Sequence, residues 1–145
     1  MKFEIRHSVF GDMQDALKLD QEAFGSDAWT LLDYLSVFTD RSVCRFTALA
    51  DGQFAGFAAA ELDKEDFVYL LTLAISPQFR RKGIASDLLK HCEEAFEAEG
   101  ARLFVDDQNQ AAIRLYEKAG YQTAGKISGY YMNGHDALIM EKTGK

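Results

Sequence analysis

Segments of β-strand character stand out first in the pattern of hydrophobic and polar positions. Apolar and polar residues alternate over 2–6, which predicts a first strand. Two β-rich segments, 43–50 and 53–62, flank the pair Asp51-Gly52, which indicates a tight hairpin. The next run, 67–75, is apolar without alternation, so we expect a strand that is buried on both faces.

Helical spacing of apolar residues marks four other stretches: 12–24, 30–38, 86–99 and 109–119. Asn109 is expected to cap the last of these helices, because an asparagine side chain accepts a hydrogen bond from the N–H groups at a helix start. Gly100 and Gly120 follow the third and fourth stretches, where glycine commonly ends a helix.

The order of these elements defines the expected fold. The apolar strand, the third helix and a strand at 102–106 form a unit whose right-handed crossover makes its two strands parallel. Segments 121–126 and 136–141 can add an antiparallel pair. We therefore expect one α+β domain, residues 1–145, with a mixed and mostly antiparallel sheet of six or seven strands.

Composition and charge narrow the class of protein. The 145 residues are 48% hydrophobic and 27% charged, which is typical of a globular domain. The net charge of −7 argues against a nucleic-acid partner; it either favours a cationic substrate or only keeps the protein soluble. No apolar run is long enough to span a bilayer and no signal-peptide pattern is present, so we expect a cytoplasmic protein without a membrane partner.

Cysteine and histidine positions give no sign of disulfide or metal chemistry. Cys44 lies in a strand pattern and Cys92 on the apolar face of a helix, so we expect buried free thiols. His7, His91 and His135 are scattered, with no cysteine or histidine at the spacing of metal ligands. The sequence therefore predicts no metal site.

A basic loop follows the apolar strand and opens the third helix. It contains Arg80, Arg81, Lys82 and Gly83. The first N–H groups of a helix have no partner within the helix and lie at the positive end of its dipole, so a phosphate gains hydrogen bonds and charge there. Gly83 lets the backbone approach such a ligand closely. The loop is thus either an anion site or a solvated surface turn.

Two patterns together carry a resemblance to a known family. The loop reads Arg80-x-x-Gly83-x-Ala85, and the stretch from Asn109 to Tyr121 reads Asn-Gln-Ala-Ala-Ile-Arg-Leu-Tyr-Glu-Lys-Ala-Gly-Tyr. Both resemble segments of the GNAT acetyltransferase superfamily, a three-layer α/β/α fold that uses acetyl-CoA as cosubstrate. The resemblance implies that the residues in contact with acetyl-CoA are Leu73, Ala74, Ile75, Arg80, Arg81, Lys82, Gly83, Ile84, Ala85, Asn109 and Tyr116.

The C-terminal part is similar to a narrower group within that superfamily. Residues 129–140 resemble the Tyr-Tyr-x-x-Gly-x-Asp-Ala-x-x-Met segment of protein N-terminal acetyltransferases. This resemblance implies that Tyr130 and Tyr131 contact the acceptor peptide; the alternative is a hairpin with ordinary aromatic pairs. Phe24 and Trp29 would line the acceptor cleft, although Trp29 can equally be a hydrophobic staple between the first two helices.

Candidate catalytic residues also follow from the resemblance. Tyr116 would donate a proton to the departing thiolate. Phe104 stands where relatives carry a glutamate or a histidine as general base, and a phenylalanine accepts no proton. Tyr69, or no dedicated base, is therefore expected, while Glu61 or Asp106 acting through a water stays open.

Amine basicity points to the class of acceptor. A protein α-amine has a pKa of about 8 and a lysine about 10.4, so at pH 7 roughly a tenth of the former is neutral against a few parts in ten thousand of the latter. A site without a strong base should favour α-amines. The expected function is direct acetyl transfer to a protein or peptide N-terminus by a monomer or weak homodimer. A small-molecule amine as acceptor, and a non-catalytic acetyl-CoA sensor, are the alternatives.

Overall fold

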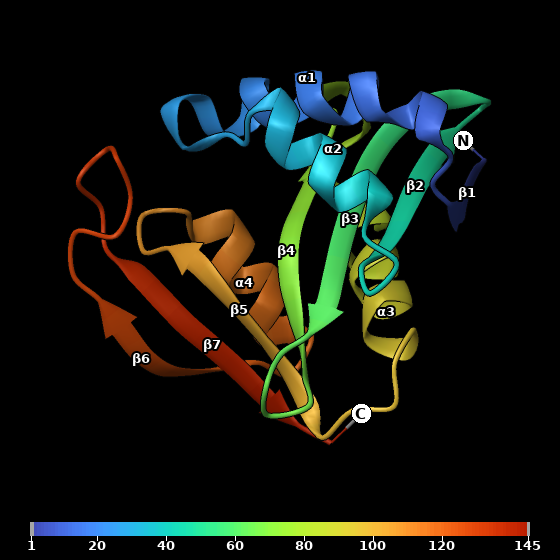
Figure 1. The fold of residues 1–145 in the computed structure, drawn as a ribbon. Coiled ribbons are helices and arrows are strands. Elements are labelled where there is room, and N and C mark those ends of the chain that lie inside the picture. Colours follow the sequence, from blue (N-terminus) through green and yellow to red (C-terminus); the bar gives the residue numbers. More distant parts are fainter. Residues whose placement is uncertain (1, 145) are drawn as a thin grey trace.

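One seven-stranded sheet forms the centre of the structure, a computed structural model that describes residues 2–144 (Figure 1). Its strands are β1 Phe3–His7, β2 Cys44–Ala50, β3 Gln53–Leu62, β4 Phe67–Ile75, β5 Gly100–Asp106, β6 Gln122–Ile127 and β7 Ala137–Thr143. They are ordered β1-β2-β3-β4-β5-β7-β6. Within the described chain, β4 and β5 are the one parallel pair of neighbours. The expected mixed, mostly antiparallel sheet is confirmed.

Helices cover both faces of this sheet, which confirms the three-layer arrangement (Figure 1). The α-helices are α1 Met13–Phe24, α2 Leu31–Thr39, α3 Ile84–Glu94 and α4 Gln110–Lys118, with 3₁₀ turns at Phe10–Asp12, Gly25–Asp27 and Pro77–Phe79. Side chains alternate along β3: Phe57 and Ala59 pack in one cluster with α1 and α2, whereas Ala58 and Ala60 pack in another with α3 and α4. Each face of the sheet therefore has its own core.

The hairpin at the start of β3 forms where the sequence predicts it. Asp51 and Gly52 both have left-handed backbones, with φ of 50° and 82°. Two consecutive positive φ angles are the requirement of the turn type that best matches the twist of paired strands. The prediction from the Asp-Gly pair is confirmed.

A bulge alters the burial pattern of β4. The pairing of β3 with β4 skips Leu71, which is therefore an extra residue in its strand. Because of this extra residue, Leu70 and Leu73 both pack with the α3 and α4 side, although they are three positions apart. Burial otherwise alternates along the strand between buried and half-buried residues. The expectation that 67–75 is buried on both faces is confirmed only in part: no residue of the strand is exposed, but Tyr69, Leu71 and Leu73 are half-buried and line the cavity.

The parallel strands pair at one end only. Phe67–Tyr69 pairs with Gly100–Arg102, but β4 continues to Ile75 and β5 to Asp106 (Figure 1). Beyond these three pairs the two strands separate. The backbone of β4 after Tyr69 thus has no strand partner on the β5 side within residues 2–144, and its polar groups are left to other partners.

Helix α3 is shorter than the helix expected over 86–99. It ends at Glu94, and the N–H of Ala95 donates to the carbonyl of Cys92. Gly100 begins β5 instead of ending the helix. A Cβ added at Gly100 would run into the carbonyl oxygen of Lys142 on β7, so strand packing is what requires glycine there.

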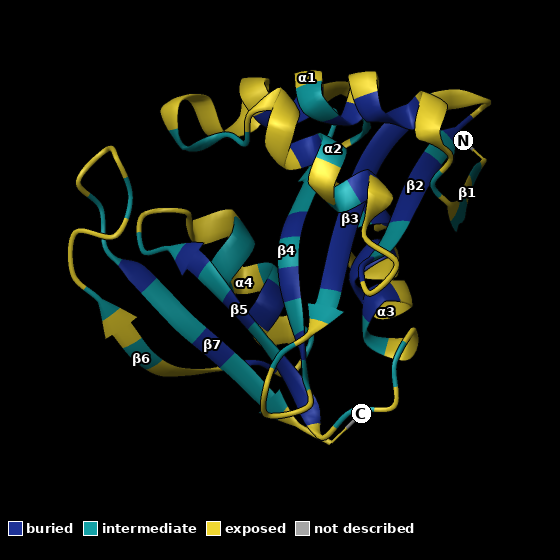
Figure 2. Cartoon of the chain, in the orientation of Figure 1, coloured by how far each residue is buried: buried dark blue, intermediate teal, exposed yellow. Residues whose placement is uncertain are grey.

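Buried residues concentrate in the central strands and in the inner faces of the helices (Figure 2). The outer faces of α1 and α2 are exposed. Within residues 2–144, no helix is both long and apolar enough to cross a membrane. Both thiols are free and Cys92 is buried, as expected, whereas Cys44 is only half-buried.

Candidate active site

A cavity of about 910 Å³ occupies the gap between the separated ends of β4 and β5. Its walls come from β4, β5, the end of α1, the start of α4 and the segment between β6 and β7. Ligands of open α/β sheets commonly bind at the carboxyl ends of parallel strands, where these strands separate. The cavity is the candidate active site.

Eight of the sequence-predicted site residues line this cavity. They are Phe24, Trp29, Tyr69, Leu73, Asn109, Tyr116, Tyr130 and Tyr131. The others do not line it: Ala74 and Ile75 end β4, Arg80–Gly83 lie in the connection to α3, and Ile84 and Ala85 begin that helix. The structure thus brings the predicted catalytic and acceptor residues together, and attaches the basic loop to one of the strands that form the cavity wall.

The basic loop has the backbone geometry that an anion site needs. Arg81 and Gly83 have positive φ angles of 63° and 84°, and Gly83 is the residue before the first turn of α3. No side chain of the described residues caps this helix, so its first N–H groups are available to a ligand. Arg80, Arg81 and Lys82 are exposed. These features fit a pyrophosphate, which they would hold by backbone N–H groups and charge.

Tyr116 is buried in α4, yet its hydroxyl group is open to the cavity. The residue is 7% exposed and packs edge to face against Tyr121. Its hydroxyl has no hydrogen-bond partner within residues 2–144, and no fully buried side-chain oxygen or nitrogen there lacks one, so this oxygen must reach the cavity surface. Burial raises the pKa of Tyr116 above its ordinary value, which keeps the hydroxyl protonated and able to donate.

An aromatic series crosses the cavity from β4 to the β6–β7 segment. Tyr69 meets Phe104 edge to face at 5.6 Å, Phe104 meets Tyr130 at 5.4 Å, and Tyr130 meets Tyr131 at 5.0 Å between ring centroids. Burial, with smaller effects of Tyr130 and Glu61, raises the pKa of Tyr69 to about 12. At neutral pH Tyr69 is thus a hydrogen-bond donor, and its expected role as a base finds no support in this environment.

Trp29 contacts both helix α2 and the cavity. Its ring packs against Tyr34 with centroids 5.3 Å apart, and the residue also lines the cavity. Its backbone N–H donates to Asp20 at 2.7 Å, and the hydroxyl of Thr72 on β4 donates to the same carboxylate at 3.3 Å. Asp20 is 3% exposed, and burial raises its pKa. The connection between α1 and α2 is therefore fastened to β4 beside the cavity.

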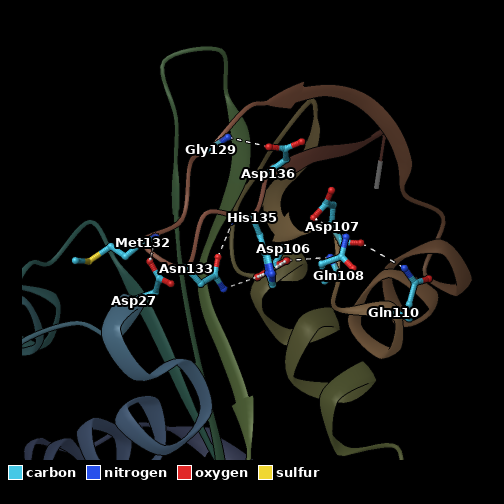
Figure 3. Close-up of polar contacts among 10 residues, drawn as sticks. All are labelled: Asp27, Asp106, Asp107, Gln108, Gln110, Gly129, Met132, Asn133, His135 and Asp136. Carbon is cyan, nitrogen blue, oxygen red and sulfur yellow. Dashed lines mark hydrogen bonds and ion pairs between the residues drawn. The ribbon is translucent and has the colours of Figure 1, made fainter.

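Negative charge dominates the cavity wall. Among the described lining residues, Asp20, Asp27 and Asp106 are the acids, and none is lysine or arginine. Asp27 accepts a hydrogen bond from the backbone N–H of Met132 at 2.9 Å, which joins the α1–α2 connection to the β6–β7 segment (Figure 3). Such a wall suits an ammonium group better than an anion.

The pairing of His135 with Asp106 was not predicted from the sequence. Nδ1 of His135 lies 2.9 Å from a carboxylate oxygen of Asp106 (Figure 3). The two residues are 29 positions apart, so no local sequence pattern marks them as a pair. Asp106 is one of the residues named from the sequence for a role through a water; it follows Phe104 by two positions and so shares its face of β5. Within residues 2–144, no group of three side chains could hold a metal ion.

The fold and the cavity together define a three-layer α/β/α protein with a ligand site between two parallel strands. The sequence profile of the acetyltransferase (GNAT) family matches residues 10–121, and the chain belongs to this family. The family resemblance stated from the sequence is confirmed.

Three known proteins show the closeness of the match. An N-alpha-acetyltransferase of Saccharolobus solfataricus is 36% identical over 78 residues, which are 51% of this chain and 47% of that protein. The ribosomal-protein-S18-alanine N-acetyltransferase of Escherichia coli has a TM-score of 0.85 and 26% identity, over 98% of this chain and 94% of that one. Arabidopsis thaliana NAA60, solved in complex with acetyl-CoA, has a TM-score of 0.82 and 21% identity, over 98% of both chains. The chain spans about half the length of the first curated relatives that it matches.

Proposed function

We propose that the protein transfers the acetyl group of acetyl-CoA directly to a primary amine, the α-amine at the N-terminus of a protein or peptide. One observation carries this proposal: the hydroxyl of Tyr116 opens on a cavity between the separated strands, and the basic loop begins just beyond one of these strands. Family membership and the acetyl-CoA and N-terminal substrates named for its relatives support it.

The reaction assigns distinct tasks to the two sides of the cavity. The loop at Arg80–Ala85 would hold the pyrophosphate, and the thioester would extend along β4 toward Tyr116. The amine nitrogen forms a bond to the acetyl carbon while the carbon–sulfur bond breaks. Tyr116 would give its proton to the thiolate, and the nitrogen loses the protons that the amide does not keep. Direct transfer needs no covalent intermediate on the protein.

Charge in the cavity supports an amine as acceptor. Asp20, Asp27 and Asp106 line the wall and would attract an ammonium group. The aromatic faces of Tyr130 and Tyr131 can contact the first residues of a peptide, and a cation can also bind over such faces. An acidic residue at the second position of the peptide would meet like charge, so we expect acidic N-termini to be poor acceptors.

A small-molecule amine is a second candidate, since such an acceptor needs a more closed pocket than a peptide does. The hydrogen bond between Asp27 and Met132 favours it because it joins two of the segments that line the cavity. A mass-spectrometric screen decides between the acceptors. The purified protein and acetyl-CoA are incubated with free amino acids, polyamines, and peptides that begin Ala-Lys or Ala-Asp. We expect acetyl addition to the Ala-Lys N-terminus, weaker addition to Ala-Asp, and none to the same peptide with a formylated N-terminus and an internal lysine. Acetylation of small amines alone would contradict the peptide assignment, and binding without transfer would favour the sensor.

A further inference from the structure

His135 lies in the segment between β6 and β7 and lines the cavity. Its Nδ1 is 3.0 and 2.9 Å from the two carboxylate oxygens of Asp106, at the end of β5. The side chain is 42% exposed, so the ring touches protein on one side and reaches open space on another. Figure 3 shows the ring of His135 beside the Asp106 carboxylate.

Both members of this pair are held by further hydrogen bonds (Figure 3). Asp106 accepts from the backbone N–H of Gln108 at 2.9 Å and from the side-chain amide of Asn133 at 3.1 Å. Asn133 in turn accepts from the backbone N–H of His135 at 2.8 Å. The carbonyl of His135 accepts from the N–H of Tyr131 at 3.2 Å. The network fixes the ring in place before any ligand binds.

Hydrogen bonding at Nδ1 decides which ring nitrogen is free. An aspartate can only accept, so the proton of a neutral imidazole belongs on Nδ1, and Nε2 keeps its lone pair. Nε2 has no hydrogen-bond partner among residues 2–144. Although burial opposes it, hydrogen bonds from Gln108, His135 and Asn133 lower the pKa of Asp106, so this carboxylate is ionised at neutral pH and stabilises an imidazolium.

The pair lies beside the residues that would surround the reacting amine. Asp106 and Phe104 are two positions apart on the same face of β5, about 7 Å from each other. Phe104 contacts Tyr69 and Tyr130. Tyr131 is near enough to Asp106 and to Tyr116 for charges to interact. His135 thus provides a proton acceptor at a different point of the cavity wall from Phe104, whose side chain accepts no proton.

We infer that His135 is the general base of the reaction, with Asp106 and Asn133 as positioning residues. This role rests on the proposed acetyl transfer. Nε2 removes one proton from the acceptor ammonium, and the electron pair of that N–H bond stays on nitrogen and forms the bond to the acetyl carbon. The sulfur takes its proton from Tyr116, the second proton of the amine restores Tyr116, and His135 returns its proton to water.

Two carboxylates face the ring of His135. Asp106 on β5 and the adjacent Asp136 are the carboxylates whose charges act on the ring. Asp136 is also bound by Lys126 of β6 at 3.1 Å and by the N–H of Gly129 at 2.8 Å. Tyr130 and Tyr131 are the other titratable side chains on the same segment.

The test compares His135→Gln with the wild-type protein, using an N-terminal peptide from pH 6.5 to 9.5. His91→Gln is the matched control, because this histidine lies on α3, outside the cavity lining. At pH 7 we expect kcat/KM of His135→Gln to fall tenfold or more, with acetyl-CoA affinity and melting temperature unchanged. The deficit should shrink above pH 8, where the amine is already neutral. Asp106→Asn should show a smaller deficit with the same trend.

Chemical rescue distinguishes the loss of a base from a shift of the loop, either of which could lower the activity of the glutamine variant. Imidazole added to His135→Gly should restore part of kcat, and should do nothing for His91→Gly. A deficit that is equal at every pH, with no rescue, would make His135 structural and overturn its role as base. Unchanged activity of His135→Gln would do the same while leaving acetyl transfer intact. A wild-type protein that acetylates no amine would instead overturn the proposed function and this role with it.

Discussion

Tyr116 and Tyr121 meet edge to face with ring centroids 5.9 Å apart, but their hydroxyl groups have different environments. The hydroxyl of Tyr121 donates to Glu93 at 2.6 Å. That of Tyr116 has no protein partner among residues 2–144 and reaches the cavity. Of these two neighbouring phenols, that of Tyr121 therefore stabilises the fold, whereas that of Tyr116 is available to a ligand.

Removal of the Tyr116 hydroxyl should slow the reaction without unfolding the protein. We expect Tyr116→Phe to lower kcat by about a hundredfold, because a coenzyme thiol with a pKa near 8.5 is a tolerable leaving group even without an acid. Acetyl-CoA affinity should be unchanged. Single-turnover kinetics, which isolate the chemical step from product release, provide the measurement.

Tyr121→Phe is the matched control for that variant. It removes the hydrogen bond to Glu93 and should lower the free energy of unfolding by about 1 to 2 kcal/mol. Its kcat should stay at the wild-type value. If both variants lose the same activity, the effect of Tyr116 is on packing, and the proton-donor assignment fails.

The aromatic pair on the β6–β7 segment should affect the acceptor and not acetyl-CoA. Tyr130 is half exposed and lies between Phe104 and Tyr131 on the cavity wall. We expect Tyr130→Ala to raise the KM of an N-terminal peptide several-fold, since aromatic faces supply much of the contact area in such sites. Calorimetry should show the same acetyl-CoA affinity as the wild type.

Phe10→Ala provides the comparison for Tyr130→Ala. Phe10 is 59% exposed and packs against Phe38, away from the cavity lining. This variant should leave the peptide KM unchanged. Equal losses of peptide and acetyl-CoA binding in Tyr130→Ala would instead indicate a collapsed segment and argue against direct contact.

Several features of the fold could be predicted from the sequence because residues that are neighbours in the chain determine them. Asp51-Gly52 forms its turn because both residues adopt positive φ angles. The side chain of Asn109 accepts from the N–H of Ala112 and caps α4, as expected. Gly83 has the left-handed backbone that the loop at the start of α3 requires. In each case the residues that set the geometry are neighbours in the sequence.

The parts that were missed depend on contacts between distant segments. The bulge at Leu71 is defined by the register of β4 against β3, and a run of apolar residues carries no mark of it. Gly100 resembles a helix terminator in sequence, but the carbonyl of Lys142 on β7 explains the glycine. His135 acquires its partner Asp106 only when the β6–β7 segment folds against the end of β5.

A carboxylate far from the cavity should control acid stability. Asp12 is bound by Arg6 at 2.7 and 3.1 Å, by the hydroxyl of Thr47 at 3.0 Å, and by the N–H of Val9 at 2.9 Å. Burial opposes ionisation of Asp12, but these hydrogen bonds outweigh it and lower its pKa. A folded-state pKa below the unfolded value stabilises the protein above about pH 4, and this contribution is lost as the pH falls through the folded-state pKa.

Asp12→Asn should therefore lower the free energy of unfolding at pH 7 by about 2 kcal/mol or more. The difference from the wild type should narrow below pH 4, because the wild-type carboxyl is then also losing its charge. Urea titrations at several pH values measure both effects. Asp15→Asn, at an exposed position of α1, is the control and should change the free energy by no more than about 0.5 kcal/mol. A gap that stays constant with pH would mean that the charge of Asp12 contributes nothing.

Two glycines with almost the same φ angle can test the anion loop. Gly83 has φ of 84° and Gly52 has φ of 82°, and at both positions an added Cβ meets no atom within 4 Å. Alanine at either position takes a positive φ, at a cost of about 1 to 2 kcal/mol in the free energy of unfolding. Gly83 precedes the N–H groups that would hold the pyrophosphate, whereas Gly52 lies in a hairpin turn. We expect Gly83→Ala to weaken acetyl-CoA binding about tenfold, equivalent to about 1.4 kcal/mol, and Gly52→Ala to leave the affinity unchanged. Titration calorimetry on the two folded variants measures the difference. The same acetyl-CoA affinity in both would identify the loop as a surface turn and remove the basis for placing the cofactor there.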